Sequence, residues 1–249
     1  MQIDFHSHVK ISKKSSFMPE YFREMMTEAR AAGLTALAVT EHFNTARFMD
    51  IYTFLQAHYP YEHDYYNIDG LKLFPGIEVD VKEGGHILLI GGGSKVLAIR
   101  RALKSHTVPD AFIPFDRLLD LADEYDMLTI GAHPYRESTP LHQLTLRQLQ
   151  RLDAFDLNGK DLYTQGIDFY RQRIADFAAA VGKPVVAGSD THQFLQYGCV
   201  VTKLANDCDT VEELKHCIKM GKYQIHISND LRLKVKSATL VKKYMKKLL

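Results

Sequence analysis

Short apolar segments with strand character alternate with amphipathic helical segments along most of the chain. Residues 19–33 illustrate the helical pattern, because Pro19 suits an opening turn, apolar residues recur on one helix face, and Gly33 ends the segment. Similar helical patterns cover residues 95–104, 115–126, 145–153, 166–181 and 210–220. Strand patterns cover residues 2–8, 35–40, 71–80, 86–91, 127–132, 154–159 and 184–188. Seven strands alternating mostly with helices predict an α/β barrel.

The first strand carries the first candidate chemistry. Side chains alternate along an extended segment, so Asp4, His6 and His8 are predicted to share one face, with Ile3 and Phe5 on the other. Two imidazoles at this spacing lie about 7 Å apart at the backbone, so their rings are able to converge on one ion such as zinc or iron. Asp4 is predicted to orient one of these imidazoles from behind.

The third and fourth strands are predicted to form a hairpin. Seven residues separate Glu78 from His86, whereas a parallel crossover needs a dozen or more. A hairpin brings the end of one strand and the start of the next to the same rim of the barrel. Glu78 and His86 are therefore expected to share a site.

Metal-competent side chains recur where the predicted strands end. They are His6, His8, His42, Glu78, His86, His133, Asp190 and His192. In α/β barrels this rim collects the catalytic groups. A closed structural zinc site needs four ligands, usually with cysteine among them. Six imidazoles and two carboxylates instead favour two or three divalent ions (Zn, Mn or Fe) with a bridging carboxylate, for which Glu78 is the candidate.

Composition sets the broad class of the protein. Of 249 residues, 46% are hydrophobic and 24% are charged, and the net charge of +1 provides no global field for nucleic acid. No apolar run is long enough to span a membrane, and the N-terminus starts directly in a strand without a secretory signal. Three cysteines without a paired spacing favour a reducing compartment. We therefore expect a cytoplasmic protein with neither a membrane nor a stable nucleic-acid partner, and a homo-oligomer stays open.

Two segments outside the rim each have more than one interpretation. Residues 59–66 are dense in tyrosine and predict a rim loop that either packs on the barrel or stacks on an aromatic substrate group. Residues 231–249 contain seven Lys or Arg and no acid. Their apolar stripe comprises Leu240, Val241, Tyr244, Met245, Leu248 and Leu249. We favour a helix packed on the barrel with a solvated basic face, although a membrane-surface or nucleic-acid role would use the same pattern.

Six short motifs occur in order between residues 4 and 192. They are Asp4-Phe-His6-Ser-His8, Thr40-Glu41-His42, Gly76-Ile-Glu78-Val, Gly85-His86-Ile-Leu, Ala132-His133-Pro134 and Gly188-Ser-Asp190-Thr-His192. This ordered set resembles the metal motifs of the PHP (polymerase and histidinol phosphatase) family. The resemblance implies a distorted (β/α)7 TIM-like barrel, a single domain over residues 1–249 with closing elements at 199–249. It also implies metal-dependent phosphoesterase chemistry at a multinuclear site.

Carried over from that family, the ligands divide among three ions. The first ion would be held by His6, His8, Glu78 and Asp190, the second by Glu78, His86 and His133, and the third by His42 and His192. The chain has Thr40-Glu41-His42 where the family usually has Thr-Asp-His, a mild change.

A second departure from the family pattern concerns the third ion. Members normally place an Asp or His five or six residues after the second histidine, but here Lys13 and Lys14 occupy those positions, and a protonated lysine cannot ligate. We hypothesise that Lys13 or Lys14 supplies the positive charge of the third ion, which would leave a two-metal enzyme. The alternative is that both lysines are solvated.

The expected reaction is hydrolysis of a phosphate ester on a small metabolite, of histidinol phosphate or nucleotide type, by a metal-bound hydroxide. Arg136 is the best candidate for gripping the phosphate, and Lys10 is the next. If a third ion is absent, His192 or His42 is placed to protonate the leaving group. Two alternatives stay open: an amidohydrolase-type metal hydrolase, which also opens with His-x-His, and a non-catalytic PHP-like accessory module.

Overall fold

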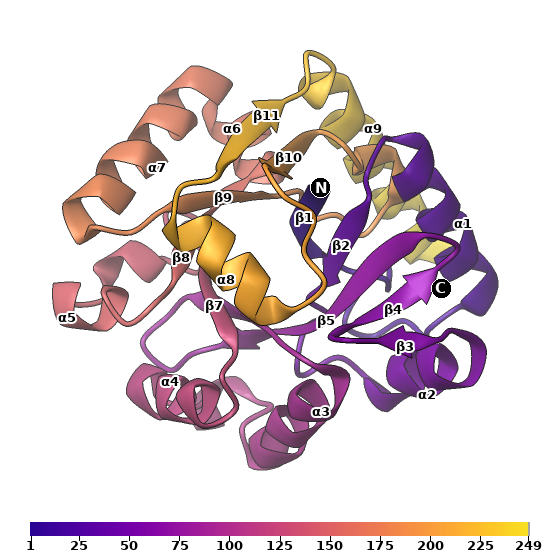
Figure 1. The fold of residues 1–249 in the computed structure, drawn as a ribbon, viewed down its shortest axis with the longest axis horizontal. Helices are drawn as coiled ribbons and strands as arrows, with labels where there is room; N and C mark the ends of the chain where they lie inside the picture. The colour runs from indigo at the N-terminus through magenta and orange to yellow at the C-terminus, as the bar shows by residue number, and fades with distance from the viewer. Residues whose placement is uncertain (249) are drawn as a thin grey trace.

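The computed structural model describes residues 1–248, with side chains through residue 247. Seven strands form the wall of a nearly closed barrel: β1 (Gln2–Ser7), β2 (Ala36–Val39), β5 (Leu71–Asp80), β6 (His86–Ile90), β7 (Leu128–Ala132), β8 (Ala154–Asn158) and β9 (Val185–Gly188). They follow one another around the wall in this order (Figure 1). The circle is completed just beyond β9 and β1, where the backbone N–H of His8 donates to the carbonyl of Thr191 at 2.9 Å. The predicted seven-stranded α/β barrel is confirmed.

The hairpin predicted from the short connection between Glu78 and His86 is present. β5 pairs antiparallel with β6, with Asp80 opposite His86, and β6 pairs antiparallel with β7. The remaining neighbouring pairs along the wall are parallel. β6 therefore runs against the other six strands, and its first residue lies at the rim where the others end.

Helices pack around the barrel wall and across one of its ends, and most follow the predicted segments. They are α1 (Pro19–Ala31), α2 (Met49–His58), α3 (Gly93–Ala102), α4 (Phe115–Glu124), α5 (Leu146–Leu149), α6 (Gly159–Gln165), α7 (Ile167–Val181), α8 (Val211–Lys219) and α9 (Leu231–Leu248). α5 is shorter than the helix predicted there, and the sequence pattern did not show α6. The side chain of Asn158 caps α6 by accepting the backbone N–H of Lys160 at 3.0 Å.

Apolar side chains form an outer layer and a barrel interior. Leu37 and Leu89 face outward and pack in the cluster that includes the covering helices. Phe5 and Ile130 face inward and pack in one cluster with Leu214 of α8. Figure 1 shows α8 lying across the opening of the barrel beside the N-terminus. α8 therefore plugs the N-terminal end of the barrel, and the polar site lies at the other end.

The prediction that the tyrosine-rich segment forms a loop at the site rim is wrong. Two short strands, β3 (Tyr61–Glu62) and β4 (Tyr65–Ile68), form a hairpin there, and β4 pairs with the first residues of β5. The start of β5 lies at the end of the barrel opposite Glu78. Tyr65 and Tyr66 are buried, so these tyrosines are packing residues remote from the site.

The chain after β9 first extends the sheet and then returns to the rim. β10 (Val200–Leu204) pairs antiparallel with β1, and β11 (Tyr223–Ile227) pairs antiparallel with β10. α9 follows and ends the described chain. None of the described helices is both long and apolar enough to cross a membrane.

The apolar stripe predicted for α9 is only partly correct. Leu231, Val235 and Ala238 are its buried residues, whereas Leu240 and Tyr244 are 53% and 57% exposed. Two further predicted members are not described: the side chain of Leu248 and the whole of Leu249. The reason is that α9 lies beside the polar rim of the barrel, so the face turned inward near its C-terminus is not its most apolar one.

Candidate functional site

All eight predicted ligands meet at the rim opposite α8. Their donor atoms form four overlapping groups, and within each group the atoms lie within 4.8 Å of one another. The groups are His8–His42–His192, His6–His8–Asp190, His6–Glu78–His133 and His42–Glu78–His86. The second group contains most of the set predicted for the first ion. The pair predicted for a third ion is joined by His8, and the set predicted for the second ion is divided between two groups.

A register shift in β1 spans the residues around His6, between Asp4 and Ser7. The pairing of β1 with β2 is irregular there, and a bulge of this kind re-aims the side chains around it. Phe5 belongs to the barrel interior, and yet the neighbouring His6 also points inward, to the cluster. The prediction that Phe5 faces away from the histidines is therefore wrong, because simple alternation does not hold across a bulge.

Asp156, rather than Asp4, orients an imidazole. Asp4 Oδ1 accepts the backbone N–H groups of His6 at 3.1 Å and of Ser189 at 2.9 Å, so it joins β1 to the end of β9. Asp156 Oδ2 lies 3.0 Å from Nδ1 of His6, which leaves Nε2 of that ring for an ion. The sequence motifs did not indicate Asp156 as a site residue. The available signal was its inward position on β8, two residues before Asn158.

Glu78 occupies the centre of the cluster. Its Oε1 lies 2.6 Å from Nδ1 of His86 and 3.3 Å from Nε2 of His133. Its Oε2 lies 2.7 Å from Nδ1 of His42 and 3.4 Å from Nε2 of His8. The two oxygens thus face different imidazoles, which is the arrangement that a carboxylate bridging two ions requires.

The charges of the cluster depend strongly on one another. Burial by itself raises the pKa of Glu78, but the imidazoles of His42, His86 and His6 outweigh it and hold this pKa well below its usual value. Burial opposes the charged form of His86, yet Glu78 raises its pKa to about 9. Burial keeps the pKa of His133 well below its usual value. Some of these rings therefore hold protons that a bound cation would displace.

Several buried nitrogen and oxygen atoms of the cluster make no hydrogen bond of acceptable geometry with another described residue, although some lie close to a neighbouring ring. They include Nε2 of His6, both ring nitrogens of His8 and Oε2 of Glu78. Buried polar groups without partners are costly, and a divalent cation would satisfy these atoms together. Imidazole and carboxylate donors suit Zn, Mn and Fe alike. The residues present therefore fit a centre for divalent metal.

The ammonium of Lys10 is held in hydrogen bonds within the protein and has a structural role. It donates to Thr45 Oγ1 at 2.9 Å and to the carbonyl of Ala46, and the carbonyl of Lys10 lies 2.6 Å from Nδ1 of His192. These contacts do not support the predicted phosphate-binding role of Lys10. The carbonyl instead accepts the Nδ1 proton of His192 and leaves Nε2 of that ring facing the cluster.

Of the two lysines in the usual ligand loop, Lys13 reaches the cluster. Its Nζ lies 3.2 Å from Oδ2 of Asp80, and Oδ1 of Asp80 lies 2.9 Å from Nε2 of His86. Lys14 is exposed. The ammonium of Lys13 thus acts on the imidazole of His86 through Asp80, a residue that the sequence motifs did not indicate.

Arg136 lies beside the ligand Asp190. Its Nη2 lies 2.7 Å from Oδ2 of Asp190 and donates to Oδ1 of Asn158 at 3.2 Å, while its Nε donates to Asp161 Oδ2 at 3.1 Å. The two carboxylates hold the guanidinium at the wall of the adjoining cavity. Its predicted role in gripping a phosphate stays a prediction that this position favours.

Two of the rim ligands have left-handed backbone conformations. His133 has a φ of 32° and Asp190 a φ of 56°, which for residues other than glycine costs about 1–3 kcal/mol each. The backbone N–H of Asp190 donates to the carbonyl of His6 at 2.7 Å, so the closure of the barrel holds this conformation. Strain of this kind is concentrated at functional sites.

A cavity of about 490 Å³ adjoins the cluster. The rim contributes His42, Asp190 and His192 to its wall. The basic side chains that line this cavity are those of Arg136, Lys160, Lys242, Lys243 and Lys246, the last three on α9. The expectation that the basic face of α9 is simply solvated is therefore wrong in part, because three of its lysines line the cavity beside the site.

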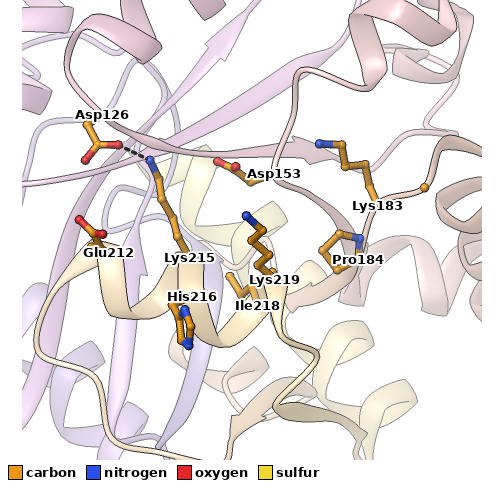
Figure 2. A pocket seen from close by; sticks show the side chains of 10 residues that line it. Asp126, Asp153, Lys183, Pro184, Glu212, Lys215, His216, Ile218 and Lys219 are labelled. Carbon is orange, nitrogen blue, oxygen red and sulfur yellow. Dashed lines mark hydrogen bonds and ion pairs between the residues drawn. The ribbon is translucent and has the colours of Figure 1, made fainter.

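A second cavity, of about 710 Å³, lies at the other end of the barrel. Figure 2 shows Lys215 of α8 reaching across it to Asp126, at 2.7 Å, with Glu212 nearby. None of its described lining residues belongs to the metal cluster. This cavity is thus separate from the candidate site.

Known proteins similar to this chain share its fold. Residues 170–223 match a family model described as "PHP-associated". No curated protein matches the chain by sequence. Among solved structures, PsfC from Pseudomonas syringae PB-5123 has a TM-score of 0.81 at 19% identity, with 98% of each chain covered.

Two more distant structures have the same barrel. The lesion-specific endonuclease Q of Pyrococcus furiosus has a TM-score of 0.64 at 19% identity, over 90% of this chain and 58% of its own. An amidohydrolase from Chromobacterium violaceum has a TM-score of 0.54 at 15% identity, over 89% of this chain and 97% of its own. At these identities the likeness concerns the fold alone, and this chain spans little more than half of endonuclease Q. The match of residues 170–223 to the PHP-associated model bears out the resemblance over that segment, and the solved structures show that the chain has their barrel fold, with a candidate divalent-metal centre at its rim.

Proposed function

We propose that this chain is a metal-dependent phosphoesterase acting on a small phosphate monoester. The main support is the convergence of six imidazoles and two carboxylates beside a cavity with cationic walls. A multinuclear metal centre and adjacent Arg or Lys side chains together suit a substrate whose reacting group is a phosphate dianion. The amidohydrolase alternative uses a similar barrel, but such a substrate would give the cationic wall no role.

Divalent ions at this centre would generate a water-derived nucleophile and polarise the phosphoryl oxygens. His6, His8, Glu78 and Asp190 would hold one ion, and Glu78 would share a second with His86 and His133. In the net reaction the oxygen of water bonds to phosphorus, the bond to the ester oxygen breaks, and that oxygen leaves as an alcohol with one proton from water.

The pKa values of His42 and His192 do not support their expected role as proton donors. Both rings line the cavity, which is the observation behind the expected acid role. Burial, however, lowers the pKa of His42 and holds the pKa of His192 well below its usual value. A neutral imidazole presents a lone pair and has no extra proton to donate. Water in the cavity is then the source of the proton for the leaving group.

Protein loaded with Mn, Zn or Fe is expected to hydrolyse p-nitrophenyl phosphate and not a panel of lactones and amides. His133→Ala or Asp190→Ala is expected to abolish hydrolysis because each removes a ligand, while circular dichroism shows the fold retained. Turnover of a lactone or amide but not of the phosphate would favour the amidohydrolase alternative. Metal binding without hydrolysis of any substrate would favour the accessory-module alternative.

The number of ions tests the role of Lys13. We expect two ions per chain by elemental analysis of metal-loaded protein, because the ammonium of Lys13 stands where the family normally offers a third-ion ligand. Lys13→Asp is expected to raise the count to three by restoring a carboxylate there. Lys14→Asp, on the exposed neighbour, is the matched control and is expected to leave the count at two. Three ions in the unmodified protein would contradict the idea.

A further inference from the structure

Four lysines from two helices line the cavity beyond the metal cluster. Lys160 belongs to α6, and Lys242, Lys243 and Lys246 belong to α9. The ion pairs found among the described residues involve other cations, such as Arg136 with Asp190, and none of these four lysines. The cavity wall therefore carries positive charge that the described residues do not neutralise by direct pairing.

The lysines are close enough to act on one another. Burial lowers the pKa of Lys242 to about 8, and although Asp190 favours its charged form, the charges of Lys246 and Lys160 disfavour it. Lys242 and Lys246 are one helical turn apart and so share a face of α9. Like charges held together destabilise a folded chain. An anion in the space between these lysines would relieve their repulsion.

The scissile phosphate alone does not account for this wall. That phosphate would lie against the metal centre, where the ions and Arg136 provide positive charge. Lys243 and Lys246 are exposed and belong to the part of the cavity wall that α9 contributes, so they would meet a different part of the substrate. A cavity of about 490 Å³ is of the size that takes a small molecule.

We propose that the substrate carries a second phosphate group, which Lys242, Lys246 and Lys160 bind while the first is hydrolysed at the metal centre. This inference rests on the proposed phosphoesterase function and adds the substrate class, a small bisphosphate. Ammonium groups bind phosphate through charge-assisted hydrogen bonds. The second phosphate would thus hold the substrate without taking part in the reaction.

The test compares propyl phosphate with 1,3-propanediol bisphosphate and with longer alkanediol bisphosphates, using metal-loaded protein. The best bisphosphate is expected to have a kcat/KM about 10- to 100-fold above that of the monoester, mainly through a lower KM. The double variant Lys242→Met/Lys246→Met keeps the aliphatic stems and is expected to lose most of this preference by raising KM for the bisphosphate. Lys236→Met, on an exposed part of α9 outside the cavity wall, is the matched control and is expected to retain the preference.

Each contrary result has its own meaning. Hydrolysis of propyl phosphate without any preference for a bisphosphate would overturn this inference and leave the proposed function standing. If the protein hydrolyses no ester, the proposed function fails. The second-phosphate site is then tested by calorimetry, which measures the binding of 1,3-propanediol bisphosphate to the metal-free wild-type protein and to the double variant. Binding that the double variant weakens supports the second-phosphate site, and equal binding by both proteins overturns it. Faster hydrolysis of a short single-stranded oligonucleotide than of any bisphosphate would also overturn it, in favour of a nucleic-acid substrate.

Discussion

Glu78→Gln is expected to lower kcat/KM for p-nitrophenyl phosphate by about 10³-fold or more. The glutamine keeps the shape of the side chain but removes its charge and turns one of its two acceptor oxygens into a donor. Both oxygens of Glu78 face imidazoles, at distances from 2.6 Å to 3.5 Å, so whichever oxygen is replaced, one side of the cluster loses its bridge. The measurements are steady-state kinetics with saturating metal and the metal content of the purified variant.

The matched control for Glu78→Gln is Glu212→Gln. Glu212 lines the cavity beside α8 at the other end of the barrel (Figure 2), so the same chemical change there is expected to leave kinetics and metal content unaltered. Thermal unfolding of both variants separates a local effect from loss of the fold. Wild-type turnover and metal content in the Glu78 variant would show that this carboxylate does not bridge the ions.

Gly188→Ala is expected to destabilise the protein and to weaken metal binding at the same time. A Cβ at position 188 would lie 2.3 Å from Cβ of His6 and 3.0 Å from its backbone nitrogen, so β9 and β1 must move apart. Overpacking of this kind costs about 1–3 kcal/mol, and the movement displaces a ligand of the metal centre. The free energy of unfolding from urea denaturation and the metal affinity from calorimetry are the two measurements.

Gly92→Ala is the matched control for Gly188→Ala. There the added Cβ would meet only side-chain atoms, Oδ1 of Asp64 and the hydroxyl of Tyr61, each at 3.2 Å, so a smaller stability loss and an unchanged metal affinity are expected. If Gly188→Ala lowered stability without affecting metal affinity, the packing of β9 on β1 would matter for the fold and not for the position of His6.

The barrel and the membership of the site were predictable because both follow from local pattern and chain direction. Apolar periodicity marks each strand, and parallel strands end at one rim, so metal-competent residues at strand ends must come together there. The hairpin followed from chain length alone, since the connection from Glu78 to His86 is too short for a crossover. With that reversal, His86 at the start of its strand joins residues that stand at the ends of theirs.

The tertiary structure alone decided which side chains support the ligands and what surrounds them. The bulge in β1, the pairing of Asp156 with His6, and the lysines of α9 at the cavity all depend on segments distant in sequence. Periodicity describes the face that a residue occupies on its own element, but not the register, tilt or neighbour of that element. The sequence by itself therefore determined the barrel and its ring of eight candidate ligands, while packing between remote elements determined their orientation and charge.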